Sequence, residues 1–338
     1  MMLCNFQVVV RMIALAVWLA GSMTVHAAAS RAALAPEEQT FVQEMVDRHG
    51  FERAALERAF RGTKFIDSII RAMDAPSTSL PWHEFRARYI TDARINGGLK
   101  FWAAHAAVLE RAAAEYSVAP EIIVATIGVE TLFGRHTGNI RVLDALTTLA
   151  FGYPRRAEFF RGELEQFLLL TRETRLGLNT IKGSIAGAIG LPQFLPSSYR
   201  KYAVDFDGDG ERDLRSVADA VGSVANYYRH FGWQDGAAVI VPVDAGDTTL
   251  DAMLAAGIAP HTSVAEFRKR GVVPQIPVSD ELAAALIAVE TESGMRYWLA
   301  LNNFYVITRY NRSVNYAMVV NELASTLRRE RLRALAQR

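Results

Sequence analysis

The sequence predicts a mainly α-helical protein of the α+β class, with a small β-containing part late in the chain. Apolar residues recur at helical spacing over much of residues 37–231 and again over about 315–334. Residues 239–301 instead contain short apolar runs between turns. The chain has 338 residues, of which 51% are hydrophobic and 22% are charged. This composition excludes a disordered chain, and the length suffices for one large core with a second or third packed unit.

Charge and cysteine content exclude several classes of protein. There are 37 basic and 36 acidic residues, so the basic excess typical of a nucleic-acid-binding protein is absent. The single cysteine, Cys4, excludes a disulfide framework, a cysteine-based zinc site and thiol catalysis. The seven histidines show no metal-binding spacing.

The first thirty residues are typical of a secretory signal peptide. Arg11 precedes an uncharged apolar run over 12–25, and small residues follow at 27–30. We expect a signal peptide over 1–29 with cleavage near Ala27 to Ala29. The alternative is an uncleaved membrane anchor, for which the apolar run is short. No cysteine follows the run, so a lipoprotein is not expected.

Helix and loop signals organise the first third of the mature chain. Apolar spacing from residue 37 ends at His49-Gly50, which is a typical helix stop. Residues 75–81 contain two prolines and predict a loop. A long helix is predicted from about Gly98 to Tyr116.

The remaining elements follow from proline, glycine and period. Pro120 suits a first helical turn, and the helix that it begins is predicted to run to about Phe133 and stop near Gly134. The sequence shows no internal repeat. The other predicted elements are helices over 155–174, 217–231 and about 315–334, and strands over 239–243, 282–289 and 297–301.

One carboxylic acid lies on an apolar helix face. Ile123, Ile127 and Glu130 are spaced i, i+4 and i+7, so they share a face. Burial there would raise the pKa of Glu130 and keep it protonated near neutrality, as a general acid requires. The alternative is a structural glutamate paired with Arg135 or Arg156.

A glycine-rich stretch follows over 182–199. Glycine recurs at 183, 187 and 190, which suits a close approach of backbone to a ligand. Ser184 and Gln193 could donate or accept hydrogen bonds there. The alternative is a plain connection; phosphate binding is not expected, because the P-loop order is absent.

Five motifs together resemble the lytic murein transglycosylase B family (glycoside hydrolase family 103). They occur in the order of that family and span about 90 to 320, most of the mature chain. The motifs are Gly128–Thr131, Tyr153–Phe160, Lys182–Tyr199, Gly222–Tyr228 and Thr308–Ser313.

The resemblance implies a lysozyme-like helical core and a reaction on peptidoglycan. The family cleaves the β-1,4 bond between N-acetylmuramic acid (MurNAc) and N-acetylglucosamine (GlcNAc) without water. The muramoyl O6 attacks its own anomeric carbon and leaves a 1,6-anhydro end. One carboxyl serves as acid and then as base, and Glu130 matches it. Asp144, the candidate for a second carboxylate, is interpreted as a helix cap.

The resemblance also implies substrate contacts for further residues. Ser184 matches a residue that orients the muramoyl acetamido group. Phe194 and Tyr316 are candidate sugar platforms, with core packing as the alternative. Arg155 and Arg156 match a pair near the glycan or stem peptide, with plain surface charges as the alternative. The residues that match other cleft positions are Gln193, Tyr227, Tyr310 and Asn311.

An acidic loop predicts a structural calcium site. Its acids stand at positions 1, 3 and 5 and glycine at position 6, as at the start of an EF-hand loop. Position 12 is Ser216, so Asp219 is expected to close a lengthened loop of the kind that the family has. The alternative is an acidic turn without an ion. The candidate ligands are Asp205, Asp207, Asp209, the carbonyl of Glu211, Asp219 and, directly or through water, Asp213.

The domain organisation and partners follow from the same resemblance. We expect a monomeric periplasmic enzyme without an organic cofactor, acting on glycan strands, with other cell-wall enzymes as candidate partners. The rival functions are a hydrolytic muramidase and a non-catalytic peptidoglycan-binding scaffold. After the signal peptide, the expected divisions are a helical region over 30–90, a catalytic core over 91–236 with its loop at 205–219, a β-containing domain over 237–300 and a returning segment over 301–338.

Overall fold

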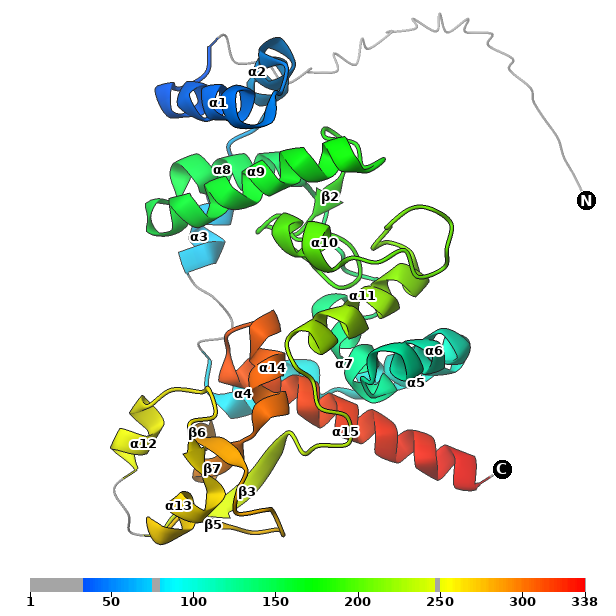
Figure 1. The fold of residues 1–338 in the computed structure, drawn as a ribbon, viewed down its shortest axis with the longest axis vertical. Helices are drawn as coiled ribbons and strands as arrows, with labels where there is room; N and C mark the ends of the chain where they lie inside the picture. Colours follow the sequence, from blue (N-terminus) through cyan, green and yellow to red (C-terminus); the bar gives the residue numbers. More distant parts are fainter. Residues whose placement is uncertain (1–32, 75–79, 247–249, 338) are drawn as a thin grey trace, which may run out of the picture.

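The structure, a computed structural model, describes residues 33–74, 80–246 and 250–337. The predicted signal peptide lies outside the described residues, as does most of the predicted loop at 75–81. The described chain is mainly helical with one five-stranded sheet, which confirms the predicted class (Figure 1).

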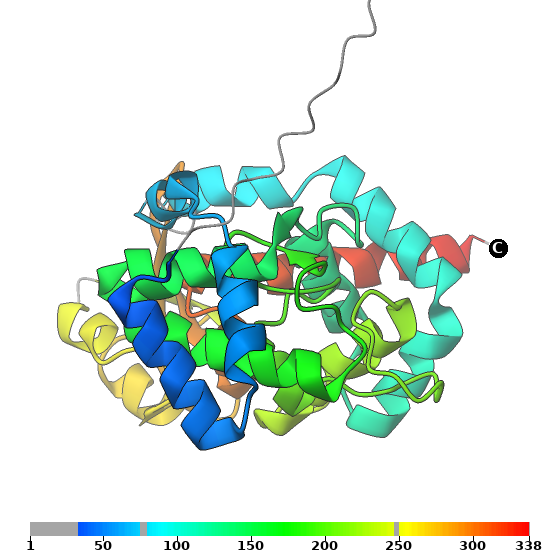
Figure 2. The same ribbon diagram turned by 90° about the horizontal axis from the view of Figure 1, so that it is seen from above.

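The N-terminal helices form one end of the molecule. Helices α1 and α2 lie over α8 and α9 (Figures 1 and 2), and α3 packs on α8. Helix α1 begins with proline in its first turn and ends at Gly50, whose φ of 65° is left-handed, as the stop signal predicted. The bounds are α1 Pro36–His49, α2 Arg53–Arg61, α3 Asp67–Asp74, α8 Val142–Gly152 and α9 Ala157–Glu173, with a 3-10 turn at Pro154–Arg156.

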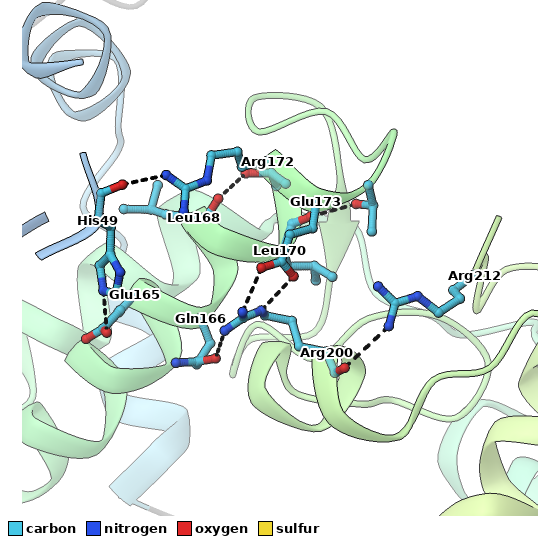
Figure 3. Close-up of polar contacts among 11 residues, drawn as sticks. His49, Glu165, Gln166, Leu168, Leu170, Arg172, Glu173, Arg200 and Arg212 are labelled. Atoms are coloured by element: carbon cyan, nitrogen blue, oxygen red, sulfur yellow. Dashed lines mark hydrogen bonds and ion pairs between the residues drawn. The ribbon is translucent and has the colours of Figure 1, made fainter. Parts of the chain in front are cut away.

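Polar contacts join this end to the rest of the chain along α9 (Figure 3). His49 and Glu165 are 2.8 Å apart, and Arg172 donates to the carbonyl of His49 at 2.7 Å. Arg200, on α10 (Pro196–Tyr202), donates to both carboxylate oxygens of Glu173 at 2.9 and 2.7 Å. These contacts therefore hold both α1 and α10 to α9.

Helix α7 is the centre of the core. It contacts α5, α6, α11 and α15, and residues 122–129 are all buried. A helix buried on every side is apolar all round, and the sequence of α7 fits that position. The bounds are α4 Trp82–Tyr89, α5 Asp92–Ala104, α6 Ala106–Tyr116, α7 Pro120–Thr131, α10 Pro196–Tyr202, α11 Val217–His230, α14 Asn302–Tyr310 and α15 Val314–Ala336.

The prediction of one long helix over 98–116 is wrong, because the helix is interrupted at His105. The break separates α5 from α6, with φ −121° and ψ 26° at His105. Its ring packs on Phe101 with centroids 4.7 Å apart. The break lets α5 pack on α7 and α15 while α6 packs on α11. Strong helix formers flank this position, so local propensity gives no signal for it.

The late part of the chain forms an antiparallel sheet in the order β4-β6-β7-β3-β5. The three predicted strands are confirmed, although β7 begins at Gly294, before the predicted position. Two short strands and two short helices were not predicted, because two-residue strands carry no period. The bounds are β3 Ile240–Asp244, α12 Asp251–Ala255, β4 Thr262–Ser263, α13 Val264–Lys269, β5 Val273–Pro274, β6 Ala283–Thr291 and β7 Gly294–Ala300.

Two further observations complete the fold. Strands β1 (Ile140–Arg141) and β2 (Lys182–Gly183) pair as a small second sheet beside the glycine-rich stretch. Among the described residues no single helix is long and apolar enough for a membrane span; α6 and α7 reach that threshold only as a pair, which is bent by 115°.

Candidate active site

Glu130 lies in the last turn of α7, where the helix is anchored to the glycine-rich stretch. Leu132 ends the helix in the left-handed conformation, with φ 50°. The hydroxyl of Thr131 donates to the carbonyl of Leu191 at 2.9 Å and accepts the N–H of Gly134 at 3.0 Å. These contacts fix the backbone on the C-terminal side of Glu130.

Glu130 lines an open cavity of about 310 Å³. Tyr316 donates its hydroxyl proton to Oε1 of Glu130 at 2.6 Å. Burial raises the pKa of Glu130 to about 7, and the hydrogen bond from Tyr316 opposes this shift only in part. Tyr316 holds Oε1, so Oε2 is the oxygen available to carry a proton towards a substrate.

The structural alternative for Glu130 is not supported. Among the described residues Glu130 forms no ion pair, with Arg135, Arg156 or any other base. Arg156 instead lies over the ring of Phe159, 4.2 Å from its centroid. A structural glutamate paired with a base would have a lowered pKa, because the base stabilises the carboxylate. The pKa of Glu130 is instead raised.

No second carboxylate lies in this cavity among its described lining residues. Asp144 is buried, and its carboxylate accepts the N–H of Lys64 at 2.8 Å and pairs with Arg141. The helix-cap interpretation of Asp144 is wrong, because α8 begins at Val142 and the residue lies inside the first turn. Asp144 instead fastens the chain at residue 64 to α8.

Arg94 shapes the cavity wall, and the sequence did not reveal it. Its Nε donates to the carbonyl of Gly128 at 3.0 Å. Another guanidinium nitrogen donates to the carbonyls of Arg88 and Tyr89 at 2.9 and 3.0 Å. Burial lowers the pKa of Arg94. These contacts join three segments of the chain, and no local spacing signals them.

Phe194 and Tyr316 are packed side chains, as the core alternative predicted. Phe194 is 2% exposed and Tyr316 is 3% exposed, so neither offers an open ring face to a sugar. Phe194 packs against Tyr227 and Tyr310, with centroids 5.5 and 5.7 Å away. Tyr310 stacks on Tyr316 at 6.3 Å with an angle of 14°.

The aromatic cluster of Phe194, Tyr227, Tyr310 and Tyr316 contacts Glu130 through the hydroxyl of Tyr316. The hydroxyl of Tyr310 donates to the carbonyl of Pro192, and that of Tyr227 donates to the carbonyl of Arg309. The hydroxyl of Tyr228 lies 2.8 Å from that of Thr126. Each buried hydroxyl is therefore satisfied within the protein, which favours a structural role for the cluster.

Ser184 and Gln193 are half-buried residues of the glycine-rich stretch. Ser184 Oγ accepts the N–H groups of Ala186 and Ala188 at 3.3 and 3.1 Å, so its own proton remains available for donation. Gln193 has a left-handed φ of 53°. Its amide nitrogen donates to the carbonyls of Thr137 and Gly190 at 3.1 and 2.8 Å, and its oxygen remains an acceptor.

Ser184 and Gln193 are not among the residues that line the cavity at Glu130, and the remaining candidate contacts lie outside its lining as well. Asn311 is exposed directly after α14. Arg155 and Arg156 are exposed at the start of α9, and Arg155 lies 3.3 Å from a carboxylate oxygen of Asp74. None of these three residues lines the cavity at Glu130.

Three aspartates of the acidic loop converge. Carboxylate oxygens of Asp205, Asp207 and Asp209 all lie within 4.8 Å of one another. Asp205 accepts the N–H groups of Gly208 and Gly210, both at 2.8 Å, and these hydrogen bonds fix the conformation of the loop. Clustered hard oxygen donors fit Ca²⁺.

The other expected ligands are placed differently. Asp219 is 1% exposed and lies outside the three-aspartate cluster. Its two oxygens accept the N–H groups of Phe206 and Asp213, both at 2.7 Å, so it closes the loop through the backbone. The carboxylates of Glu211 and Asp213 pair with Arg175 and Arg215.

Comparison with known proteins gives consistent matches. A family model described as a transglycosylase SLT domain matches residues 33–325. The membrane-bound lytic murein transglycosylase B of Escherichia coli is 43% identical over 302 residues, covering 86% of this chain and 82% of the relative.

Solved structures resemble the whole described fold. The soluble lytic transglycosylase SltB1 of Pseudomonas aeruginosa is 46% identical with a TM-score of 0.82, covering 88% of this chain and 99% of that one. The E. coli lytic transglycosylase Slt35 in complex with calcium is 42% identical, with a TM-score of 0.80 and coverage of 88% and 94%. P. aeruginosa SltB3 in complex with NAG-anhNAM-pentapeptide is 29% identical, with a TM-score of 0.75 and coverage of 86% and 79%.

Proposed function

Because the chain belongs to the family of SLT-domain transglycosylases, we propose that it cleaves the MurNAc-β-1,4-GlcNAc bond of peptidoglycan and leaves 1,6-anhydroMurNAc ends. It is a lytic murein transglycosylase with a lysozyme-like fold, as the sequence motifs predicted. The single observation that carries the chemistry is the raised pKa, about 7, of a lone carboxyl in an open cavity. Digestion of purified sacculi with analysis of product mass tests the proposal.

Glu130 acts in two steps. In the first, Oε2–H protonates the glycosidic oxygen while the bond from the muramoyl C1 to that oxygen breaks. In the second, the muramoyl O6 bonds to C1 and passes its proton to the Glu130 carboxylate. The acid is regenerated and no water is consumed, so a second carboxylate to activate water is not required, unlike in ordinary glycosidases.

Tyr316 suits both steps. Its hydrogen bond to Oε1 stabilises the carboxylate that exists between them, while burial keeps Glu130 protonated beforehand. Since the pKa is about 7, the protonated fraction falls as pH rises through neutrality. Activity should therefore decline tenfold per pH unit well above pH 7.

Replacing Tyr316 with phenylalanine should move that decline to higher pH. The change removes a contact that lowers the pKa of Glu130, so the pKa should rise by about one unit. Turnover should also fall, because the intermediate carboxylate loses its donor. Initial rates on sacculi from pH 5 to 9 measure both effects. Tyr297→Phe in the β-containing domain is the matched control, and an unmoved pH profile for Tyr316→Phe would contradict the role.

Ser184 and Gln193 are proposed to position the sugar. The available proton of Ser184 suits the carbonyl oxygen of the muramoyl acetamido group. The free oxygen of Gln193 suits a sugar hydroxyl or amide N–H. Asn311, Arg155 and Arg156 are proposed to contact more distant parts of the glycan or stem peptide, and Tyr227 and Tyr310 to support the cleft from behind.

The acidic loop is proposed to bind Ca²⁺ with a structural role. Asp205, Asp207 and Asp209 would supply the carboxylates and Glu211 its carbonyl, with Asp219 holding the loop to α11. The homologous calcium complex of Slt35 supports this proposal. The chemistry at Glu130 needs no ion, because its proton transfers are complete without one.

Export by a cleaved signal peptide over 1–29 would place a monomeric enzyme at its peptidoglycan substrate in the periplasm. We propose five parts for the chain: a signal peptide over 1–29, a helical region over 30–90, a catalytic core over 91–236, a β-containing domain over 237–300 and a returning segment over 301–338. Other cell-wall enzymes are its proposed partners.

A further inference from the structure

A second open cavity, of about 500 Å³, lies beyond the glycine-rich stretch. Its cationic lining is formed by the exposed side chains of Arg175, Lys182 and Arg215. No carboxylate belongs to its described lining, and Thr180 adds a hydroxyl. The cavity is therefore suited to an anion.

Consecutive residues of the chain line this cationic cavity and the cavity of Glu130. His136 lines the first cavity and Thr137 lines the second, and consecutive Cα atoms lie only about 3.8 Å apart. The Gln193 amide bridges the carbonyls of Thr137 and Gly190, which are both in the wall of the second cavity. A substrate in contact with Gln193 thus reaches the edge of the cationic cavity.

The three cations keep capacity for a ligand. Lys182 lies on β2, two residues before Ser184, and it has no ion-pair partner among the described residues. Arg215 contacts Asp213 through Nε and one terminal nitrogen. Arg175 pairs with Glu211, although its side chain is 84% exposed. Glu211 and Asp213 line a neighbouring cavity and do not belong to the lining of the cationic cavity.

We propose that the cationic cavity binds a carboxylate of the stem peptide on the muramoyl residue being processed. The inference rests on the proposed function, since it assumes a muramoyl sugar beside Glu130. The cavity is distinct from the Arg155–Arg156 pair. Those residues precede α9 and Arg175 follows it, and a helix of 17 residues is about 25 Å long.

Binding to an inactive protein separates this inference from catalysis. In the Glu130→Gln background, Arg175→Ala with Lys182→Ala is compared with a control, Arg58→Ala with Lys100→Ala. The control also removes one arginine from an exposed ion pair and one exposed lysine. Calorimetry measures three ligands: the GlcNAc-anhydroMurNAc disaccharide with its pentapeptide, the same disaccharide without peptide, and the pentapeptide form with its carboxylates amidated.

The cavity variant should bind the pentapeptide form about tenfold more weakly, equivalent to about 1.4 kcal/mol, and the peptide-free disaccharide unchanged. The amidated ligand should bind the parent as weakly as the free acid binds the variant. The control should match the parent throughout. Equal losses for both natural ligands, no loss for either, or full affinity for the amidated ligand would each overturn the proposal. Turnover of sacculi by the wild type tests the proposed function separately.

Discussion

Glu130→Gln should fold normally and lose at least about 10²–10⁴-fold in turnover of sacculi. The amide preserves the shape of the side chain and can still accept from Tyr316, but it cannot transfer a proton to the leaving oxygen. Rates of release of soluble muropeptides measure the loss. Near-wild-type turnover would remove Glu130 from its role.

The same variant should also change how the stability of the protein depends on pH. The pKa of Glu130 is about 7 in the folded protein, against an ordinary value of 4.5. Between these values the folded state binds more protons than the unfolded state, so the free energy of unfolding decreases as pH rises. Glu130→Gln removes this loss of stability. Its free energy of unfolding should exceed that of the wild type by up to about 3 kcal/mol at pH 8, but by little at pH 4. Denaturant unfolding at the two pH values measures the difference, and a destabilised variant at pH 8 would contradict the buried-acid account.

Calcium should raise the melting temperature and a chelator should lower it. Asp205, Asp207 and Asp209 repel one another within one loop, and a bound ion removes that repulsion. A ligand that binds only the folded state stabilises it by about 2.7 kcal/mol at a hundredfold excess over Kd. Calorimetric melting with millimolar calcium and with chelator measures the shift.

The response should depend on the loop alone. Asp205→Ala with Asp209→Ala should abolish it, whereas Asp235→Ala with Asp251→Ala, at exposed sites elsewhere, should retain it. Activity at low temperature should survive chelation, because the proton transfers belong to Glu130. Identical melting curves, or lost turnover in a protein that remains folded, would contradict a structural ion.

Local sequence patterns predicted the parts of the fold that local forces determine. Pro120 and the apolar run after it predicted α7, and the position of Glu130 on that run predicted a buried acid with a raised pKa. The longer strands were predicted by their β-favouring runs. The break at His105 was not, because packing against α7, α15 and α11 decides it rather than the residues around it.

The surroundings of the acid depend on contacts between distant segments. Tyr316 and Glu130 are 186 residues apart, and the motif resemblance suggested a sugar platform where the structure has a hydrogen-bond donor. Arg94 likewise reaches Gly128 across 34 residues. Such pairs leave no periodic signal in one sequence, so only the folded chain reveals them.

The mass of the products from purified sacculi tests the central claim most directly. If the muramoyl O6 attacks C1, every cleaved strand ends in 1,6-anhydroMurNAc. Each terminal muropeptide is then one water lighter than its reducing counterpart, and borohydride does not reduce it. The account predicts anhydro ends from the wild type and none from Glu130→Gln. Reducing ends as the main product would show that water attacks instead, and would contradict the account.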